Sequence, residues 1–376
     1  MSEDAARPVP RRDWLAGALR TGAAFALPSR QALAAEAQAA PNRAARISVA
    51  LNENAFGPSP RVIQALAAEL HGLERYTGEE AHQLTRQVAQ LENVAEEQVV
   101  LGEVLEPLGL QLGLQGGPGG EFLYSEPGYT ALVDAARPVG GVAVPIPLNA
   151  RLENDLPAFR ARLSARTRAV FLVNPHNPSG TLSEPAQLEA AVSELSKKAL
   201  VVVDEAYLDY TEEAAKRTLV ARVRAGENVI VFRTFSKLHG LAALPFGYAI
   251  APRALADSLH KSGLGSARSL NRLAVRAAAA SLRDPGHLLS VRAKVARERV
   301  RFHEVLEELK LRHSDSNASF VFFESPRAQP ALAAALAAEG IDVGRAFPPL
   351  LNWTRISLGQ PAENQRVQAA LRRALA

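Results

Sequence analysis

The chain has 376 residues, enough for two ordinary domains, and its 47% apolar and 22% charged residues are typical of a folded globular protein. This balance excludes a disordered or fibrous chain, and the lack of any run of about 20 apolar residues predicts no stable membrane association. The net charge of +4 comes from scattered arginines and predicts no nucleic-acid partner, and the absence of cysteine excludes disulfides and thiolate metal sites.

Residues 1–40 have the composition of an export signal. Arg11-Arg12 precedes a weakly apolar run at 16–27, and the small residues at 32–39 offer cleavage sites. The twin arginine indicates the Tat route and hence a periplasmic protein. Arg20 interrupts the apolar run and favours the alternative, an alanine-rich extension of a cytoplasmic protein. In both interpretations this segment lies outside the fold.

From residue 46 onward, short β-branched runs alternate with longer helical stretches. The predicted strands are 98–101, 120–124, 141–146, 169–173, 200–203 and 229–232. The predicted helices are 60–70, 81–92, 129–136, 157–165 and 184–197. This alternation leaves room for crossover helices and predicts an α/β domain whose mostly parallel central sheet is covered on both faces.

Beyond residue 252 the pattern changes to a long helical stretch at 269–309, a strand at 320–323, a helix at 330–339 and a strand at 353–358. These elements predict a smaller α+β domain. The predicted division is an export segment at 1–40, an N-terminal arm at 41–60, a large domain at 61–255 and a small C-terminal domain at 256–376.

Three segments follow predicted strands, where an open α/β sheet builds its site. They are Val-Asn-Pro-His-Asn-Pro-Ser-Gly at 173–180, Val-Asp-Glu-Ala-Tyr at 203–207 and Arg-Thr-Phe-Ser-Lys at 233–237. In this order they resemble the fold type I aminotransferases that depend on pyridoxal 5'-phosphate (PLP), and most of all histidinol-phosphate aminotransferase-like enzymes. The resemblance extends from Leu51 to Gly359 and implies the fold type I PLP-dependent transferase fold, with no metal.

The resemblance assigns roles around the cofactor ring. Lys237 matches the lysine that forms the Schiff base and moves the substrate proton, and Asp204 matches the carboxylate that keeps the ring nitrogen protonated. Asn177 and Tyr207 match the residues that hydrogen-bond the phenolic oxygen, and Tyr129 matches the aromatic side chain that stacks on the ring. The structural alternatives are a helix cap for Asp204, a turn former for Asn177 and core packing for Tyr129.

The substrate side of the resemblance rests on three residues. Arg355 matches the arginine that binds the substrate α-carboxylate, for which a planar guanidinium is well suited, although a surface salt bridge is the alternative. Asn54 lies in a substrate-side motif in which Ala55 replaces the usual proline. Arg345 resembles an arginine that binds the distal phosphate of histidinol phosphate, and it could equally be solvated.

The phosphate side departs from the family. Ser236 and the Gly102 loop match phosphate-binding positions, and Tyr76 matches a tyrosine that reaches the partner subunit's cofactor, which implies a homodimer. However, the loop after Gly102 carries two acids, and a proline stands where relatives have an arginine. We expect weaker phosphate binding, or a site rebuilt with other arginines; the residues concerned are Glu103, Glu106, Pro245, Arg268 and Arg272.

The resemblance therefore predicts an enzyme that exchanges an amino group between an amino acid and a 2-oxo acid. Two alternatives stay open: other PLP chemistry on the same scaffold, such as that of a decarboxylase, racemase or lyase, and a non-catalytic descendant that binds a ligand in the old cleft.

Overall fold

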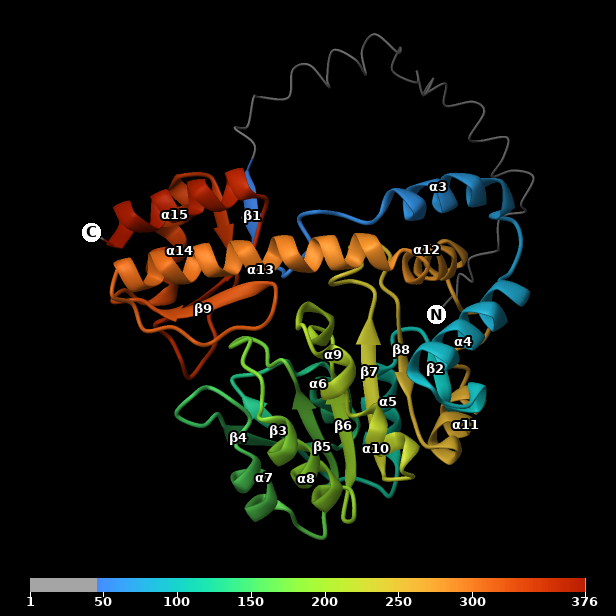
Figure 1. Cartoon of the computed structure of the whole chain (residues 1–376). Helices are drawn as coiled ribbons and strands as arrows, with labels where there is room; N and C mark the ends of the chain where they lie inside the picture. Colours follow the sequence, from blue (N-terminus) through green and yellow to red (C-terminus); the bar gives the residue numbers. More distant parts are fainter. Residues whose placement is uncertain (1–45, 376) are drawn as a thin grey trace, which may run out of the picture. The chain divides into compact units, whose positions relative to one another are not determined.

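The central feature of the molecule is a seven-stranded sheet with the strand order β2-β8-β7-β6-β5-β3-β4 (Figure 1). The computed structural model describes residues 46–375, so the predicted export segment at 1–40 lies outside the described residues. The strands are β2 (Val99–Leu101), β3 (Glu121–Glu126), β4 (Val142–Pro147), β5 (Thr167–Val173), β6 (Leu200–Asp204), β7 (Val229–Thr234) and β8 (Gly247–Ile250).

Most neighbouring strands in this sheet are parallel. β4, β3, β5, β6 and β7 pair in parallel, and β8 lies antiparallel between β7 and β2. The six predicted strands correspond to β2 to β7, so the mostly parallel α/β sheet is confirmed. Sequence analysis missed β8, whose four residues include Gly247 and Ala249, two residue types that are depleted in strands.

Helices cover both faces of the sheet, as the alternating pattern predicts. One face packs against α3 (Pro60–Glu69), α4 (Glu79–Glu92), α7 (Leu156–Arg162), α8 (Pro185–Leu195), α10 (Val220–Arg224) and α12 (Arg272–Leu282). The other packs against α5 (Leu105–Leu114), α6 (Ala131–Ala136) and α11 (Arg253–Lys261). This two-sided burial is why β5 and β6 consist almost entirely of buried residues.

A second core lies around two small sheets. β9 (Phe320–Glu324) pairs antiparallel with β11 (Trp353–Ser357), and β1 (Ile47–Val49) pairs in parallel with β10 (Ile341–Val343). Three helices pack on this core; they are α13 (Pro285–Glu308), α14 (Gln329–Ala338) and α15 (Pro361–Leu375). Pairing with β10 brings the segment that follows β1 close to the C-terminal strands.

The predicted helical stretch at 269–309 is helical in the structure, but it is not a single helix. The structure divides it into α12 and α13, with Asp284 between them. Pro285 disfavours a helical conformation at Asp284, whose side chain instead accepts a hydrogen bond from the His287 amide and caps α13. The break at Asp284 lets α12 pack on α3 and α4, while α13 runs toward the second core (Figure 1).

The predicted domain boundary near residue 255 stays a prediction. Residues 46–375 cluster as one compact unit, and α12 lies beyond the predicted boundary but packs on helices that precede it. In the part of the chain that the structure describes, no helix has the length and apolar character needed to span a membrane.

Candidate active site

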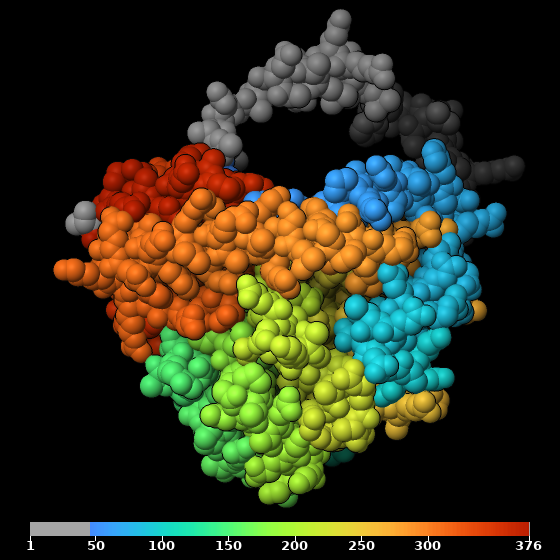
Figure 2. Space-filling model, viewed as in Figure 1, coloured from blue at the N-terminus to red at the C-terminus, as the bar shows by residue number. Residues whose placement is uncertain are grey.

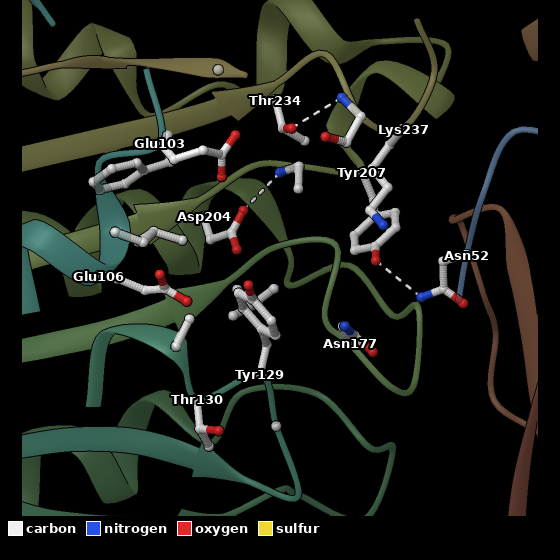
Figure 3. Close-up of a pocket in the computed structure, with 18 of the residues that line it drawn as sticks. Asn52, Glu103, Glu106, Tyr129, Thr130, Asn177, Asp204, Tyr207, Thr234 and Lys237 are labelled. Carbon is white, nitrogen blue, oxygen red and sulfur yellow. Dashed lines mark hydrogen bonds between the residues drawn. The ribbon is translucent and has the colours of Figure 1, made fainter. Parts of the chain in front are cut away.

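A cavity of about 480 Å³ lies at the carboxyl ends of the parallel strands. Its wall is built from the segments that follow β2, β3, β5, β6 and β7, together with residues near β1 and β11. Nine of the predicted site residues line it: Gly102, Tyr129, Asn177, Asp204, Tyr207, Ser236, Lys237, Arg345 and Arg355. Figure 3 shows several of these side chains pointing toward a common space.

Lys237 reaches the cavity from a short turn after β7. The Ser236 amide donates to Thr234 Oγ1 (3.0 Å), which orders this turn. Lys237 Nζ donates to the carbonyl of Leu51 at 3.3 Å and lies 5.8 Å from the centre of the Tyr207 ring. The amine is half-buried and has no carboxylate bonded to it among the described residues, so it remains available to a bound molecule.

Asp204 ends β6 as a buried carboxylate. It is 4% exposed, and its Oδ1 accepts one hydrogen bond, from the Ala206 amide at 2.9 Å. Burial raises its pKa from 3.8 to about 6, because the charged form loses hydration that one amide only partly replaces. A cationic group placed beside Asp204 in the cavity would restore the charged form.

Two hydrogen-bond donors are left for a ligand beside Lys237. Tyr207 Oη accepts from Asn52 Nδ2 (2.9 Å), so its own hydrogen is free to point into the cavity. Asn177 Oδ1 accepts from Arg355 Nη1 (2.6 Å), which leaves Asn177 Nδ2 as the free donor. Together these two donors suit an anionic oxygen.

Asn52 is a site residue that sequence analysis missed. Its side chain positions Tyr207, and Ser357 Oγ in turn accepts from the Asn52 amide (2.8 Å) and donates to Asn52 Oδ1 (3.0 Å). Its φ of 57° lies in the left-handed region, which asparagine tolerates better than most residues. The contacts with Tyr207 and Ser357 span 155 and 305 residues, so no local pattern could have revealed them.

Arg355 and Arg345 bring two guanidinium groups to the cavity. Arg355 Nη2 donates to the Ala50 carbonyl (2.8 Å), while its buried Nε has no partner among the described residues. Burial and the neighbouring Arg345 lower the pKa of Arg355. Both guanidinium groups stack on Phe347, at 5.0 Å for Arg355 and 4.6 Å for Arg345. Arg345 itself is exposed, so this end of the cavity favours anions.

Tyr129 lies at the edge of the cavity and is 42% exposed. It follows Gly128, where a side chain would overlap the carbonyl of Ser125, so glycine is required at this turn. Burial, reinforced by the negative charge of Asp204, raises the pKa of the Tyr129 hydroxyl. The ring therefore stays neutral and can offer its face to a planar ligand.

The acidic loop also faces the cavity. Glu103 and Glu106 line the same side as Asp204, away from Asn177 (Figure 3). Burial, followed by the charge of Glu106, raises the pKa of Glu103. Gly102 begins this loop with a φ of 112°, a conformation that favours glycine. The loop thus supplies two carboxylates where the resemblance implies a phosphate.

Five of the residues considered from the sequence, Pro245 among them, do not reach this cavity. Asn54 shapes a turn: its Nδ2 donates to the Leu238 carbonyl (2.8 Å) and its Oδ1 accepts from the Phe56 amide. Arg272 pairs with Glu69 and Glu80. Tyr76, which is 77% exposed, and Arg268 also lie outside the cavity wall, and their roles stay predictions. Within one chain, therefore, neither arginine rebuilds the phosphate site.

The chain matches known proteins over most of its length. The model of the family "Aminotransferase class I and II" matches residues 46–371. A histidinol-phosphate aminotransferase of Limosilactobacillus fermentum is 34% identical over 88% of this chain and 90% of its own length. One of Anaeromyxobacter is 35% identical over 87% of this chain and 90% of its own.

A solved structure of a histidinol-phosphate aminotransferase is also similar to this chain. Histidinol-phosphate aminotransferase of Sinorhizobium meliloti, in complex with pyridoxal-5'-phosphate, is similar with a TM-score of 0.81 and 27% sequence identity. The match covers 88% of this chain and 90% of that chain.

The raised pKa of Asp204 has a consequence for stability. A carboxyl group whose pKa is higher in the folded state than in the unfolded state destabilises the fold when it ionises. The free energy of unfolding of the wild type therefore falls as the pH rises from about 4 to about 6. We expect cofactor-free Asp204→Asn to be more stable than wild type at pH 7 by about 2–3 kcal/mol. The gain should disappear below pH 4.

Urea unfolding at a series of pH values measures this difference. Asp257→Asn is the matched control, because Asp257 is an exposed aspartate on α11 whose replacement removes a charge without changing burial. An equal or lower stability of Asp204→Asn at pH 7 would contradict the electrostatic description of this site.

Proposed function

This chain belongs to the class I and II aminotransferase family, and from this membership we propose that the cavity around Lys237 is its active site. The protein is a PLP-dependent aminotransferase, which exchanges an amino group between an amino acid and a 2-oxo acid. The observation that carries the assignment is the meeting of one amine, one buried carboxylate and one buried guanidinium group in a single cavity; they belong to Lys237, Asp204 and Arg355.

The donor set fits the ring of PLP. The phenolic oxygen is an anion, and it would meet the free donors of Tyr207 and Asn177. The ring nitrogen is a cation when protonated, and it would meet the Asp204 carboxylate, whose charged form needs such a partner. The exposed face of Tyr129 suits the flat ring.

When bound, PLP supplies an electron-withdrawing ring that stabilises negative charge at the substrate Cα. Lys237 would hold the cofactor through Nζ. Once the substrate amine has taken its place on the cofactor, the freed Nζ would accept the proton from the substrate Cα and deliver it to the cofactor carbon. Arg355 binds the substrate carboxylate in a planar fork and thereby sets which Cα bond faces the lysine. The Asp204 carboxylate would keep the ring nitrogen protonated, and Asn52 holds Tyr207 in place.

The fit at the phosphate end is weaker. Ser236 lines the cavity, but so do Glu103 and Glu106, and the exposed Pro245 contributes no charge. A phosphate dianion placed there would meet two negatively charged carboxylates, unless Glu103 is protonated when the phosphate binds. The raised pKa of Glu103 favours its protonated form. This end supports a second candidate, a ligand-binding descendant without catalysis, although a binder has no need for the combination of Lys237 and Asp204.

We further propose an amino acid substrate with a second anionic group. The relatives compared above are named histidinol-phosphate aminotransferases. In this chain, Arg345 places a second guanidinium group, which is exposed, next to the buried one of Arg355. The contact of both groups with Phe347 supports an anion held between them.

A homodimer is also proposed. Ile63, Leu70, Leu73 and Tyr76 are large apolar side chains that are 54–77% exposed on α3 and the segment after it. Such a cluster of exposed apolar side chains is typical of a protein interface. Light scattering should give twice the mass of one chain, and a monomeric mass would contradict this proposal.

Periplasmic location by the Tat route stays a proposal as well, based on Arg11-Arg12 and the segment behind it. Replacing both arginines by lysine should retain the protein in the cytoplasm, as measured by cell fractionation. Unchanged export of this variant would argue against the Tat route. If the wild type and the variant are both found in the cytoplasm, the alanine-rich extension is supported instead.

Lys237→Ala tests the active site. We expect this variant to lose the visible absorbance of the lysine-bound cofactor and all measurable transamination, because no other lysine lines the cavity in the described part of the chain. In wild type, borohydride reduction should add the cofactor mass to the peptide that contains Lys237. Lys261→Ala, at an exposed lysine on α11, is the control and should behave as wild type. Activity near wild type in Lys237→Ala would refute the assignment.

Pro245→Arg tests the phosphate end. Pro245 precedes Phe246 and Gly247, and Gly247 lines the cavity. A guanidinium group at residue 245 should tighten PLP binding by about 1.5–3 kcal/mol, the contribution of a charge-assisted hydrogen bond. Titration of the cofactor-free protein, followed by visible absorbance, measures this affinity.

Pro245→Gln is the matched variant, since it removes the fixed φ of proline without adding charge. Only the difference between the two variants reports the charge. If Pro245→Arg binds PLP no more tightly than Pro245→Gln does, the phosphate lies out of reach of residue 245.

A further inference from the structure

A second cavity, of about 510 Å³, lies behind the turn that carries Lys237. Its wall comes from the end of α4, the start of α13, α9 (Ala214–Arg217), and residues 238–239. α4, α9 and α13 lie around the same part of the face shown in Figure 2. This volume is in the range of small-molecule sites.

A buried polar network separates the two cavities. Arg233 lines both of them; its Nε donates to Glu205 and its Nη1 to Asp209, each at 2.8 Å. Glu92 accepts from the hydroxyl of Tyr248 at 2.6 Å. The two acids of the second cavity, Glu92 and Asp209, are thus already bonded to groups of the protein.

Two arginines of the second cavity are not matched by acids. Arg224 donates to the Glu92 carbonyl (3.0 Å) and Arg292 to the Thr211 carbonyl (3.3 Å). Neither forms an ion pair with another residue of the described part of the chain. Each therefore keeps guanidinium donors that an anion in the cavity could use.

Much of the remaining wall is aliphatic. Leu238, Leu282 and Leu288 line the cavity, and Leu91 and Leu289 stand at its edge with 58% and 53% of their surface exposed. Covering apolar surface of this kind with an alkyl group lowers the free energy and so favours binding. Charge and apolar surface together therefore select a small molecule with a carboxylate at one end and a short alkyl tail.

We propose that the second cavity binds a small aliphatic carboxylate, with the carboxylate at Arg224 and Arg292 and the tail on the leucines. Leu238 and His239 directly follow Lys237, and Arg233 lies in the common wall. A ligand that presses on these residues changes the position of the Lys237 turn and with it the affinity for PLP. This coupling rests on the active site proposed above, whereas the binding itself does not.

Calorimetric titration of the full chain with 4-methylpentanoate tests the binding. This probe has no amino or oxo group at Cα, so it cannot be a substrate. We expect binding to wild type, and binding weaker by roughly tenfold or more for the uncharged 4-methylpentanamide and for Arg224→Gln and Arg292→Gln. Arg297→Gln, an exposed arginine on the same helix α13, is the matched control and should bind as wild type does.

Arg355→Ala separates the two cavities, because Arg355 is the carboxylate-binding residue of the first. Retained binding in this variant supports the second site. Loss of binding in Arg355→Ala with retention in Arg224→Gln would place the probe in the active site and overturn the proposal, as would equal binding of the amide. A cooperative thermal unfolding transition in each variant shows that the fold is intact.

PLP affinity, measured by visible absorbance with and without saturating 4-methylpentanoate, tests the coupling. We expect a change in wild type that is absent in Arg224→Gln, and an unchanged affinity in wild type would overturn the coupling. A chain that fails to bind PLP at all would instead contradict the proposed active site, and calorimetry on the cofactor-free protein would still decide the second cavity.

Discussion

The buried carboxylate of Asp204 is the constraint on which the site depends. It stands at the end of a strand that is buried on both faces, with one amide to replace its lost hydration. The fold alone therefore disfavours its charge, and a cationic ring nitrogen is the partner that offsets this cost. The parallel register of β5, β6 and β7 then brings Asn177, Asp204 and Lys237 to one edge of the sheet.

Arg355 connects this edge to the second core. It bonds Asn177 after β5 and the Ala50 carbonyl after β1, and it lies on β11, so three segments distant in sequence meet at one side chain. The substrate-binding group thus holds the chain segments together and is itself oriented by them. The Asn52–Tyr207 and Asn52–Ser357 contacts repeat this pattern nearby.

The two ends of the cavity have opposite charge. Arg345 and Arg355 make one end attractive to anions, while Glu103 and Glu106 oppose them at the other. In a family whose cofactor carries a phosphate, this distribution of charge disfavours the phosphate at the end that carries Glu103 and Glu106. Arg233, which lines both cavities with its charge neutralised by Glu205 and Asp209, adds no attraction for the phosphate.

The sequence by itself determined the mostly parallel sheet and nine residues that the structure brings to one cavity, because strand ends in such a sheet lie at one edge. It identified Lys237, Asp204 and Arg355 through motifs that are local in the chain. Only the tertiary structure decided the rest. It placed Asn52 on Tyr207, turned Asn54 toward Leu238, engaged Arg272 with Glu69, and split the helix at Asp284. Except for the Asp284 break, each of these depends on contacts between residues that are 150 or more positions apart, and a linear pattern cannot encode which of several polar side chains finds such a partner.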